Sequence, residues 1–384
     1  MDPSLTRHQK HASLARPEYG EFHRHEWALL GAPCSVIKDL SRKLIDRLEG
    51  EYRIGYVDAD HSAPAKEGDS FTAEWTYTDK ITYQRIDRKQ AVDTFSARQM
   101  TLHLDAVLVN GNHFNARRQI VIVHPDKEDS LRRKLDRLTN VQLVLLAEGV
   151  ERLFPFLQDK LSTLEQVPVM RLSDVQPVHE WFASQMAKSR PPLYGLVLAG
   201  GRSTRMGEDK GRIDYHGKAQ REHTADLLDP FCEQTYYSVR SDQKELPRDG
   251  RGLIHDSFDG LGAYSGLLSA FRIHPDAAWF AVATDLPLLD EIALAQLQGK
   301  RNASRFATAF LNPATRFPEP LISIWEPRSY PRLLEFLAQG YSCPRKVLIN
   351  SDIELVDPAN PEALTNVNKP DERKEIERKL KARN

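Results

Sequence analysis

The chain has 384 residues, 40% of them hydrophobic and 28% charged, with a formal net charge of −1. This length predicts two domains, and the near-neutral charge excludes a nucleic-acid binder that works by broad phosphate neutralisation. The three cysteines, Cys34, Cys232 and Cys343, exclude a disulfide framework and lack zinc-ligand spacing, which favours a reducing, cytoplasmic location. No apolar run, such as that around residues 141–147, approaches the roughly 20 residues of a membrane span, and the first 20 residues lack the apolar core of a signal peptide. We therefore expect no membrane partner.

The first half of the chain predicts an α/β domain. Residues 1–25 are polar and are expected to form a loose tail or a partly ordered extension. Short apolar runs then alternate with segments of helical periodicity, which indicates βαβ units and a mostly parallel sheet over residues 26–187. The expected strands are 27–30, 53–57, 105–109, 119–123 and 141–146, and the expected helices are 36–48, 127–138, 150–161 and 178–186.

A second βα series follows an expected linker at residues 187–192, where two adjacent prolines disfavour both helix and central strand. We assign residues 192–384 to this second domain. The fold class is therefore two doubly wound, mostly parallel α/β domains, Rossmann-like in the second half. Its expected strands are 194–198, 235–239, 279–283, 306–310 and 321–324, and its expected helices are 265–271, 291–298, 331–337 and 369–384.

The strongest functional signal is the segment LVLAGGRSTRMGEDK at residues 196–210, in which a buried strand runs directly into a glycine-rich loop. Glycines allow backbone N–H groups to approach an anion closely, and cations add charge. The spacing fits neither the P-loop nor the dinucleotide-binding pattern. The loop predicts a cradle for a polyphosphate, with a plain polar turn as the alternative. The glycines and cations concerned are Gly200, Gly201, Gly207, Arg202, Arg205 and Lys210.

Polar residues at the ends of other strands predict further parts of a site. Asp285 ends an apolar strand and precedes Leu-Pro, where a carboxylate could hold Mg²⁺ or could simply cap a helix. Asp256 has the same context and the same two interpretations. Asn366 and Asn368 alternate in an extended segment, so both amides could face one ligand, although Asn-x-Asn before proline is also common in turns.

Taken in order, these motifs resemble those of the molybdenum cofactor guanylyltransferase (MobA-like) family over residues 194–372. The Asp209–Lys210 pair and the Asn-x-Asn-x-Pro ending favour GTP over CTP. The resemblance implies nucleotide contacts, catalytic residues, one magnesium ligand and a pterin-facing group. The implied nucleotide contacts are Leu198, Ala199, Gly200, Gly201, Arg202, Lys210, Arg240 and Asp256. The implied catalytic residues are Lys210, Arg205 and Asp285, and Asp285 is also the implied magnesium ligand. The implied pterin-facing residues are Pro318, Asn366 and Asn368.

Two positions depart from the family pattern. Arg240 stands where the family has an asparagine that contacts the nucleotide. Residues 262–266 read Gly-Ala-Tyr-Ser-Gly, whereas the family usually has Gly-Pro-Leu-Ala/Gly-Gly. Both departures leave the contacts to the base open.

Residues 26–146 resemble the molybdopterin-guanine dinucleotide adaptor (MobB-like) family, which implies a P-loop fold for the first domain. Its phosphate-binding loop is degenerate, because Val36-Ile37-Lys38 stands where Gly-Lys-Thr is expected. We therefore expect this domain to have lost GTP hydrolysis. Four polar residues of this domain could bind a metal ion, or could simply be solvated residues at strand ends. They are Asp58, Asp60, His61 and His103.

The resemblance implies that the chain transfers GMP from GTP to molybdopterin with Mg²⁺ and releases pyrophosphate. Molybdoenzymes or cofactor-chaperone proteins are possible partners of such an enzyme. Two alternatives stay open: a nucleotidyltransferase that acts on CTP and molybdopterin or on a sugar nucleotide, and a non-catalytic cofactor-binding scaffold.

Overall fold

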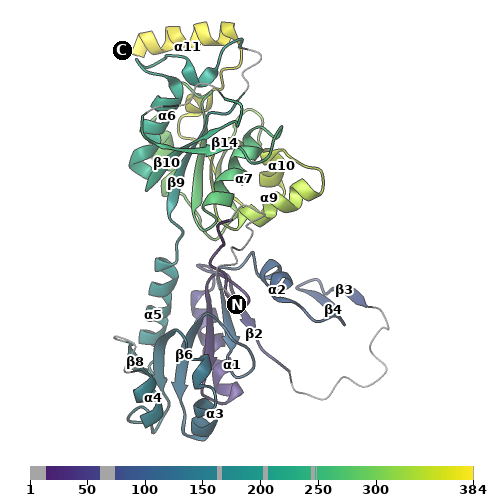
Figure 1. Ribbon diagram of the computed structural model, residues 1–384, viewed down its shortest axis with the longest axis vertical. Helices are drawn as coiled ribbons and strands as arrows, with labels where there is room; N and C mark the ends of the chain where they lie inside the picture. Colours follow the sequence, from purple (N-terminus) through teal and green to yellow (C-terminus); the bar gives the residue numbers. More distant parts are fainter. Residues whose placement is uncertain are drawn as a thin grey trace, which may run out of the picture. The chain divides into compact units, whose positions relative to one another are not determined.

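The computed structural model describes residues 14–60, 74–161, 167–201, 206–243, 247 and 249–383 (Figure 1). The chain divides into two compact units. The first unit is Tyr19–Ser189, and the second is the chain from Arg190 onward together with the described residues up to Glu18. None of the helices in the described ranges is long and apolar enough to cross a membrane.

Residues 19–25 of the polar N-terminal stretch are tied to the first strand through Glu26. The buried carboxylate of Glu26 accepts hydrogen bonds from the backbone N–H groups of Glu21, Phe22 and His23, at 2.9, 2.7 and 2.9 Å. A fourth bond comes from the N–H group of Arg117, at 2.7 Å. This polar stretch is therefore folded around a buried acid, because the acid needs donors to offset its desolvation.

A parallel six-stranded sheet with the strand order β2-β5-β1-β6-β7-β8 forms the centre of the first unit. Helices cover both of its faces, as the doubly wound class predicts: α1 and α5 pack on one side, and α3 and α4 on the other. The strands are β1 (Glu26–Leu30), β2 (Ile54–Val57), β5 (Ala106–Asn110), β6 (Arg118–Val123), β7 (Val141–Leu146) and β8 (Val169–Arg171). The helices are α1 (Cys34–Leu48), α2 (Thr94–Met100), α3 (Glu128–Arg132), α4 (Pro155–Leu161) and α5 (Val175–Lys188).

Three details of the first unit were not predicted. The helix expected at 127–138 is broken into α3 and two 3₁₀ turns, and the helix expected at 150–161 starts only at Pro155, which is favoured in a first turn. A hairpin of β3 (Trp75–Asp79) and β4 (Gln84–Arg88) pairs only with itself within the described part of the chain. Short or polar segments such as these carry little periodic signal.

The second unit contains a seven-stranded sheet with the order β11-β10-β9-β12-β14-β13-β15. All its neighbours pair in parallel except β14, which runs antiparallel to β12 and to β13. The strands are β9 (Leu193–Leu198), β10 (Gln234–Val239), β11 (Gly252–His255), β12 (Ala278–Ala283), β13 (Ala307–Leu311), β14 (Pro318–Trp325) and β15 (Glu354–Val356).

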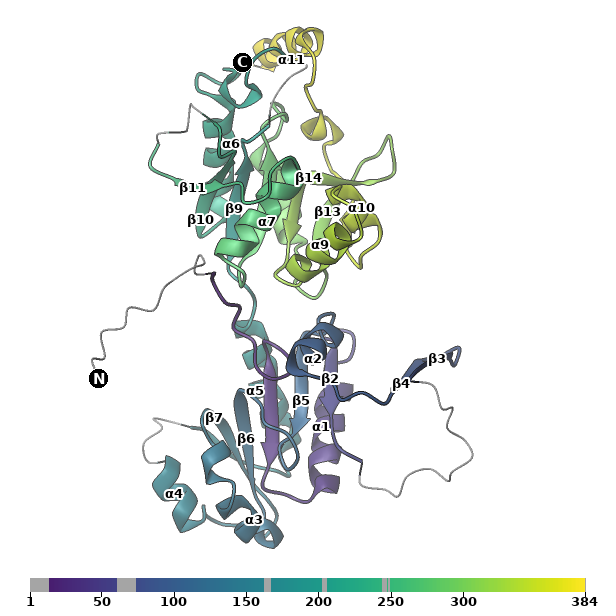
Figure 2. The same ribbon diagram turned by 45° about the vertical axis from the view of Figure 1, so that its right-hand side comes forward.

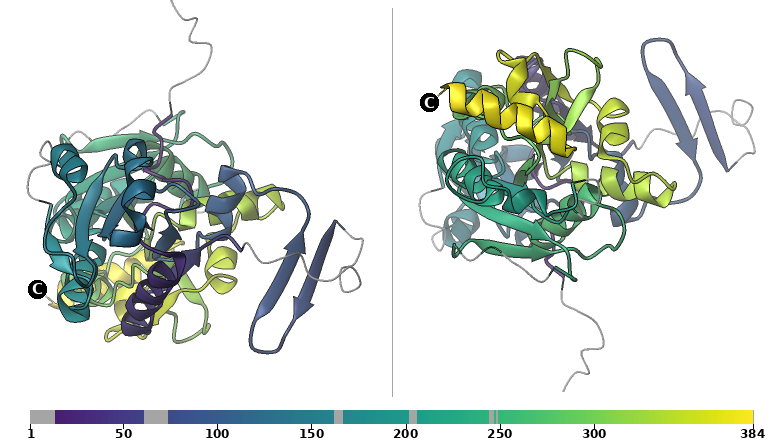
Figure 3. Two further views of the ribbon diagram at one scale, coloured as in Figure 1. Left: turned by 90° about the horizontal axis from the view of Figure 1, so that it is seen from below. Right: turned by 90° about the horizontal axis from the view of Figure 1, so that it is seen from above.

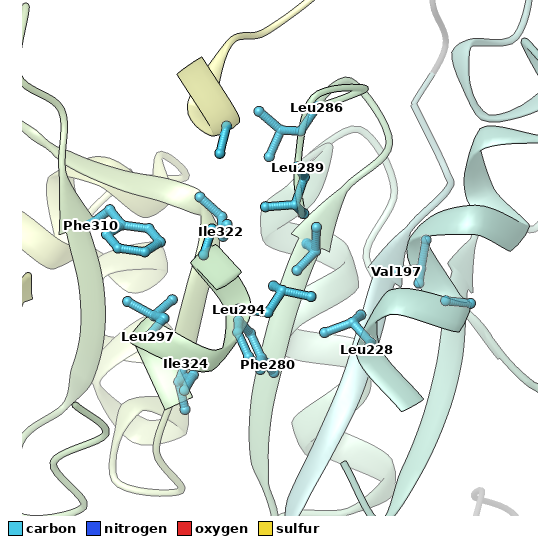
Figure 4. Close-up of a cluster of buried hydrophobic side chains, with 14 of the residues drawn as sticks. Val197, Leu228, Phe280, Leu286, Leu289, Leu294, Leu297, Phe310, Ile322 and Ile324 are labelled. Atoms are coloured by element: carbon cyan, nitrogen blue, oxygen red, sulfur yellow. The ribbon is translucent and has the colours of Figure 1, made fainter. Parts of the chain in front are cut away.

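Helices cover both faces of this sheet as well. One face packs against α6 (Gln220–Leu228) and α8 (Glu291–Gly299), and Figure 4 shows the core between them, including Phe280, Leu294 and Ile324. The other face packs against α7, α9 and α10 (Figure 2). These helices are α7 (Ala263–Ile273), α9 (Ser329–Ala338) and α10 (Pro344–Ile349).

The last helix, α11 (Pro370–Arg383), lies at one end of the second unit (Figure 1, Figure 3). It contributes Ile376 to a small apolar cluster that is separate from the two faces of the sheet. The other buried members of this cluster come from the glycine loop, the turn after β12 and the Asn-x-Asn segment; they are Met206, Ile213, Leu288 and Val367.

Candidate active site

A cavity of about 190 Å³ opens at the carboxyl ends of β9, β10 and β12 in the second unit. This is the edge at which open α/β sheets bind their ligands. Most of its lining comes from the motifs singled out in the sequence. The lining residues are Leu198, Gly200, Gly201, Asp209, Lys210, Ser238, Asp256, Gly262, Ala263, Ala283, Thr284, Asp285 and Leu321.

The glycine loop begins where β9 ends, and Arg240 holds its first residues. The Arg240 guanidinium donates to the backbone oxygens of Gly200 and Gly201, at 2.7 and 3.1 Å, and its Nε donates to Asp242 at 2.8 Å. The position of a Cβ on Gly200 would lie 3.3 Å from the backbone nitrogen of Arg240, which favours glycine there. The structure thus places Arg240 on the loop itself, whereas the resemblance implied a contact with the nucleotide.

Ala199 is buried behind the loop and does not line the cavity, although its neighbours Leu198 and Gly200 do. The predicted cations Arg202 and Arg205 lie outside the described residues. The loop's cationic contribution to the described cavity therefore comes from Lys210.

Lys210 and Asp285 face each other across the cavity. The Lys210 Nζ lies 3.7 Å from Asp285 Oδ2, and both side chains are only 16% exposed. Lys210 also donates to Asn368 Oδ1 at 2.7 Å, and the backbone oxygen of Asp285 accepts from the Val367 N–H at 2.9 Å. The structure thus brings three of the predicted motifs together at one point.

The second carboxylate oxygen of Asp285, Oδ1, is buried and finds no hydrogen-bond partner within the described part of the chain. Burial raises the pKa of Asp285, and the Lys210 ammonium opposes that rise. A buried carboxylate oxygen without a donor is costly, and a divalent cation would satisfy it. This geometry fits a Mg²⁺ ion held by one carboxylate together with substrate phosphates and water, which is a common arrangement for Mg²⁺.

Asp256 lies at the opposite side of the glycine loop, close to the start of α7. Ser238 Oγ donates to its Oδ1 at 3.4 Å, and burial raises the pKa of Asp256 to about 6. The chain enters α7 through Gly262, whose φ of 58° suits glycine. Tyr264 belongs to the Gly-Ala-Tyr-Ser-Gly segment that differs from the family pattern. Its side chain is buried in the core, where its hydroxyl donates to the Leu333 backbone oxygen at 2.6 Å.

The three residues predicted on the pterin side do not line the described cavity. Pro318 is buried at the start of β14, and Asn366 is exposed. Asn368 reaches the site through its bond to Lys210. Sequence reasoning missed Ser238 and Leu321 as lining residues. Ser238 carried a usable signal, because it is a buried polar residue within an apolar strand.

The metal site considered for the first domain is not supported. Within the described ranges, no group of three or more His, Cys, Asp or Glu side chains is placed to hold a metal ion. One of the four candidates, His61, lies outside the described residues. The other candidates, Asp60 and His103 among them, have interaction partners of their own.

Comparison with known proteins finds a family model that matches most of the second unit. Residues 195–354 match the model of the MobA-like NTP transferase domain. The molybdenum cofactor biosynthesis bifunctional protein of Synechocystis sp. is 33% identical over 185 residues, which are 48% of this chain and 53% of that protein. The match therefore spans about half the length of that relative.

Two further similar proteins cover about half of this chain. Molybdenum cofactor guanylyltransferase from Pseudomonas putida is 27% identical over 189 residues, which are 48% of this chain and 98% of that protein. The crystal structure of molybdopterin-guanine dinucleotide biosynthesis protein A from Archaeoglobus fulgidus matches with a TM-score of 0.42 and 22% sequence identity. The match covers 50% of this chain and 99% of the chain in that structure. Over residues 195–354, the C-terminal half of the chain is thus similar to the MobA-like NTP transferase domain.

Proposed function

We propose that the chain transfers GMP from GTP to the terminal phosphate of molybdopterin or its metal-bound form, which releases pyrophosphate and forms a guanine dinucleotide. The observation that carries this proposal is the Lys210–Asp285 pair, 3.7 Å apart, beside a glycine loop at the carboxyl edge of the sheet. The names of the similar proteins, which describe molybdenum cofactor guanylyltransferases, supply the substrate class.

The acceptor phosphate needs no strong base from the protein. A phosphate monoester has a second pKa of about 6, so it is largely dianionic at neutral pH and is already a nucleophile. The task of the site is then to position two anionic substrates and to offset their charge. Lys210 would bind the triphosphate of GTP, and the N–H groups of Gly200 and Gly201 would face the same phosphates.

Asp285 would hold Mg²⁺ through Oδ1, the oxygen that has no hydrogen-bond partner among the described residues. When bound there, the ion would neutralise charge on the phosphate oxygens. Asn368 keeps the Lys210 ammonium from closing fully on Asp285, because it accepts a hydrogen bond from the same Nζ at 2.7 Å. Lys210 therefore stays available to a phosphate while Asp285 stays available to a cation.

Guanine selectivity would come from Asp256. An ionised carboxylate accepts hydrogen bonds from the N1–H and N2–H groups that guanine offers and cytosine lacks in this arrangement. The partly buried position of Asp256 next to Ser238 suits such a directional contact. The first unit, by contrast, would not hydrolyse GTP, because its β1–α1 turn lacks the glycine and lysine of a P-loop.

The decisive experiment incubates the full chain with GTP, Mg²⁺ and molybdopterin and identifies the product by mass spectrometry. We expect the guanine dinucleotide and pyrophosphate. Parallel reactions with CTP, ATP and UTP test the base, and a product with CTP alone would establish the cytidylyl alternative. Asp285→Asn should abolish the product, and Asp357→Asn, at a carboxylate 85% exposed, is the matched control. Nucleotide binding without any product would support the scaffold alternative.

The wider setting of the enzyme follows from the same proposal. A guanine dinucleotide of this kind is passed to enzymes that use it, so molybdoenzymes or cofactor-chaperone proteins are the expected partners. A cytoplasmic location would fit the free cysteines Cys34, Cys232 and Cys343.

A further inference from the structure

Three side chains of the first unit meet at the carboxyl edge of its sheet, outside the site described above. Cys34 is the first residue of α1, Asp58 follows β2, and His113 follows β5. The Cys34 Sγ lies 3.3 Å from His113 Nε2. The same nitrogen lies 4.0 Å from Asp58 Oδ1. A thiol and a carboxylate thus share one imidazole nitrogen.

The Cys34 sulfur lies among several groups that carry positive charge or N–H donors. α1 has 15 residues, so its N-terminus presents partial positive charge to a side chain at its first position. Asn112 Nδ2 approaches the sulfur to 3.7 Å. Lys134 donates to the Asn112 backbone oxygen at 3.3 Å, and its ammonium interacts with Cys34 while burial lowers the pKa of this lysine.

Asp58 is held in place from two sides. Asn110 donates to its Oδ1 at 2.8 Å, and the Tyr56 hydroxyl donates to its Oδ2 at 2.8 Å. This fixed carboxylate lies 4.0 Å from His113 Nε2, so it is placed to interact with a proton that the ring would take from the thiol. His113 is thus placed as a general base, with Cys34 as the proton donor on one side and the Asp58 carboxylate on the other.

A cavity of about 430 Å³ lies along α1 and β2, the two elements that carry Cys34 and precede Asp58. Its volume is within the range of small-molecule sites. Its lining includes Ser35, the residue after Cys34, and Tyr56, whose hydroxyl donates to Asp58. Its lining mixes both signs of charge, which suits a zwitterion; it includes Ser35, Lys38, Asp39, Arg42, Asp46 and Tyr56.

We propose that Cys34 is a nucleophilic thiol that exchanges with small zwitterionic disulfides built from amino acids. His113 Nε2 takes the thiol proton, and the Cys34 thiolate attacks one sulfur of the disulfide. The disulfide bond of the reagent breaks as a new S–S bond to Cys34 forms. The departing thiolate takes the proton from His113, so Cys34 is oxidised to a mixed disulfide while half of the reagent is reduced to a thiol.

The chain offers two internal controls for this reaction. Cys343 is exposed and has no such histidine contact among the described interactions. Burial raises the pKa of Cys232 to about 12, which makes its thiolate rare at neutral pH. The rates at the three cysteines of one sample can therefore be compared directly.

The test treats the reduced full chain at pH 7 with oxidised glutathione and follows adducts by intact mass and peptide mapping. We expect Cys34 to react roughly tenfold or more faster than Cys343, and Cys232 to stay unmodified. His113→Gln should lower the rate at Cys34 to about that at Cys343 and leave the Cys343 rate unchanged. Circular dichroism and the melting temperature report whether each variant is folded.

A second arm tests the cavity. Arg42→Ala should slow the reaction of Cys34 with oxidised glutathione but not with the uncharged reagent 4,4′-dithiodipyridine, because only the zwitterion uses the charged lining. Equal slowing with both reagents would overturn the role of the cavity. If Cys34 reacts no faster than Cys343, or if the folded His113→Gln variant reacts as fast as the wild type, the proposal for Cys34 is wrong. None of these readouts depends on guanylyl transfer.

Discussion

Lys210 Nζ donates a 2.7 Å hydrogen bond to Asn368 Oδ1, although the two residues are 158 positions apart. Removing this acceptor should let the ammonium collapse onto Asp285. We therefore expect Asn368→Ala to raise the KM for GTP and to lower turnover by about tenfold, the scale of one lost charge-assisted hydrogen bond. Steady-state kinetics check this. The matched control Asn366→Ala, at an exposed amide, should leave the KM for GTP unchanged.

Asp285→Asn should remove most of the turnover, by about a hundredfold or more, because it deletes the carboxylate that would hold the cation. The variant should remain folded, since burial disfavours the charged carboxylate to begin with. Turnover at several Mg²⁺ concentrations, together with the melting temperature, measures both effects. A folded variant with near wild-type turnover would contradict the assignment.

Lys210→Met should reduce both turnover and stability. It leaves the Asp285 carboxylate buried without its cationic neighbour, and removing one partner of a buried pair costs up to about 3 kcal/mol. The double variant Lys210→Met/Asp285→Asn should recover much of the lost stability but no activity. Urea unfolding of the four proteins of this cycle gives the coupling energy. Additive losses of stability would show that the pair does not interact.

Arg240→Ala should loosen the glycine loop, because two backbone oxygens lose their donor. If Arg240 acts through the loop, the variant should bind GTP and pyrophosphate more weakly by a similar factor, since both depend on the phosphate cradle. Arg240→Lys should restore only part of the affinity, because a lysine cannot present the same fork of donors. Weaker binding of GTP with unchanged binding of pyrophosphate would instead indicate a contact to the nucleoside.

Asp256 should make stability depend on pH. Its pKa in the folded chain is about 6, above the roughly 3.9 of an unfolded aspartate, so the native state binds more protons between these values. The stabilisation is complete below about pH 4 and is lost as the pH rises through about 6. Relative to wild type, Asp256→Asn should therefore gain about 1 kcal/mol between pH 4 and pH 7, allowing for partial solvent exposure. Urea unfolding at both values measures this difference.

The alternation of strands and helices was predictable because buried parallel strands are short, continuous apolar runs, as in β7 and β9. The antiparallel direction of β14 was not predictable, because an apolar run has the same composition in either direction. The early start of β14 at Pro318 was missed for a similar reason, since proline and Glu319 are poor strand formers.

The candidate site also contains residues that could be predicted from the sequence and residues that could not. The glycine loop, Lys210 and Asp285 stood out because their chemistry is local in sequence. The role of Arg240 could not be predicted, because its partners are backbone oxygens of a loop about forty residues away. The inward turn of Tyr264 depends on the space left between α7 and α9, which no local pattern encodes.

The helix at the end of the chain has a consequence for how mutations should be interpreted. α11 places Ile376 against Met206 of the glycine loop and against Val367, whose N–H group binds the Asp285 backbone oxygen. A stop codon at position 370 would remove this helix and Asn384 but would leave every proposed catalytic side chain in the sequence. It would nevertheless expose the apolar cluster that holds the glycine loop and the segment bonded to Asp285 in position. We therefore expect such a truncation to impair the active site although it removes no active-site residue.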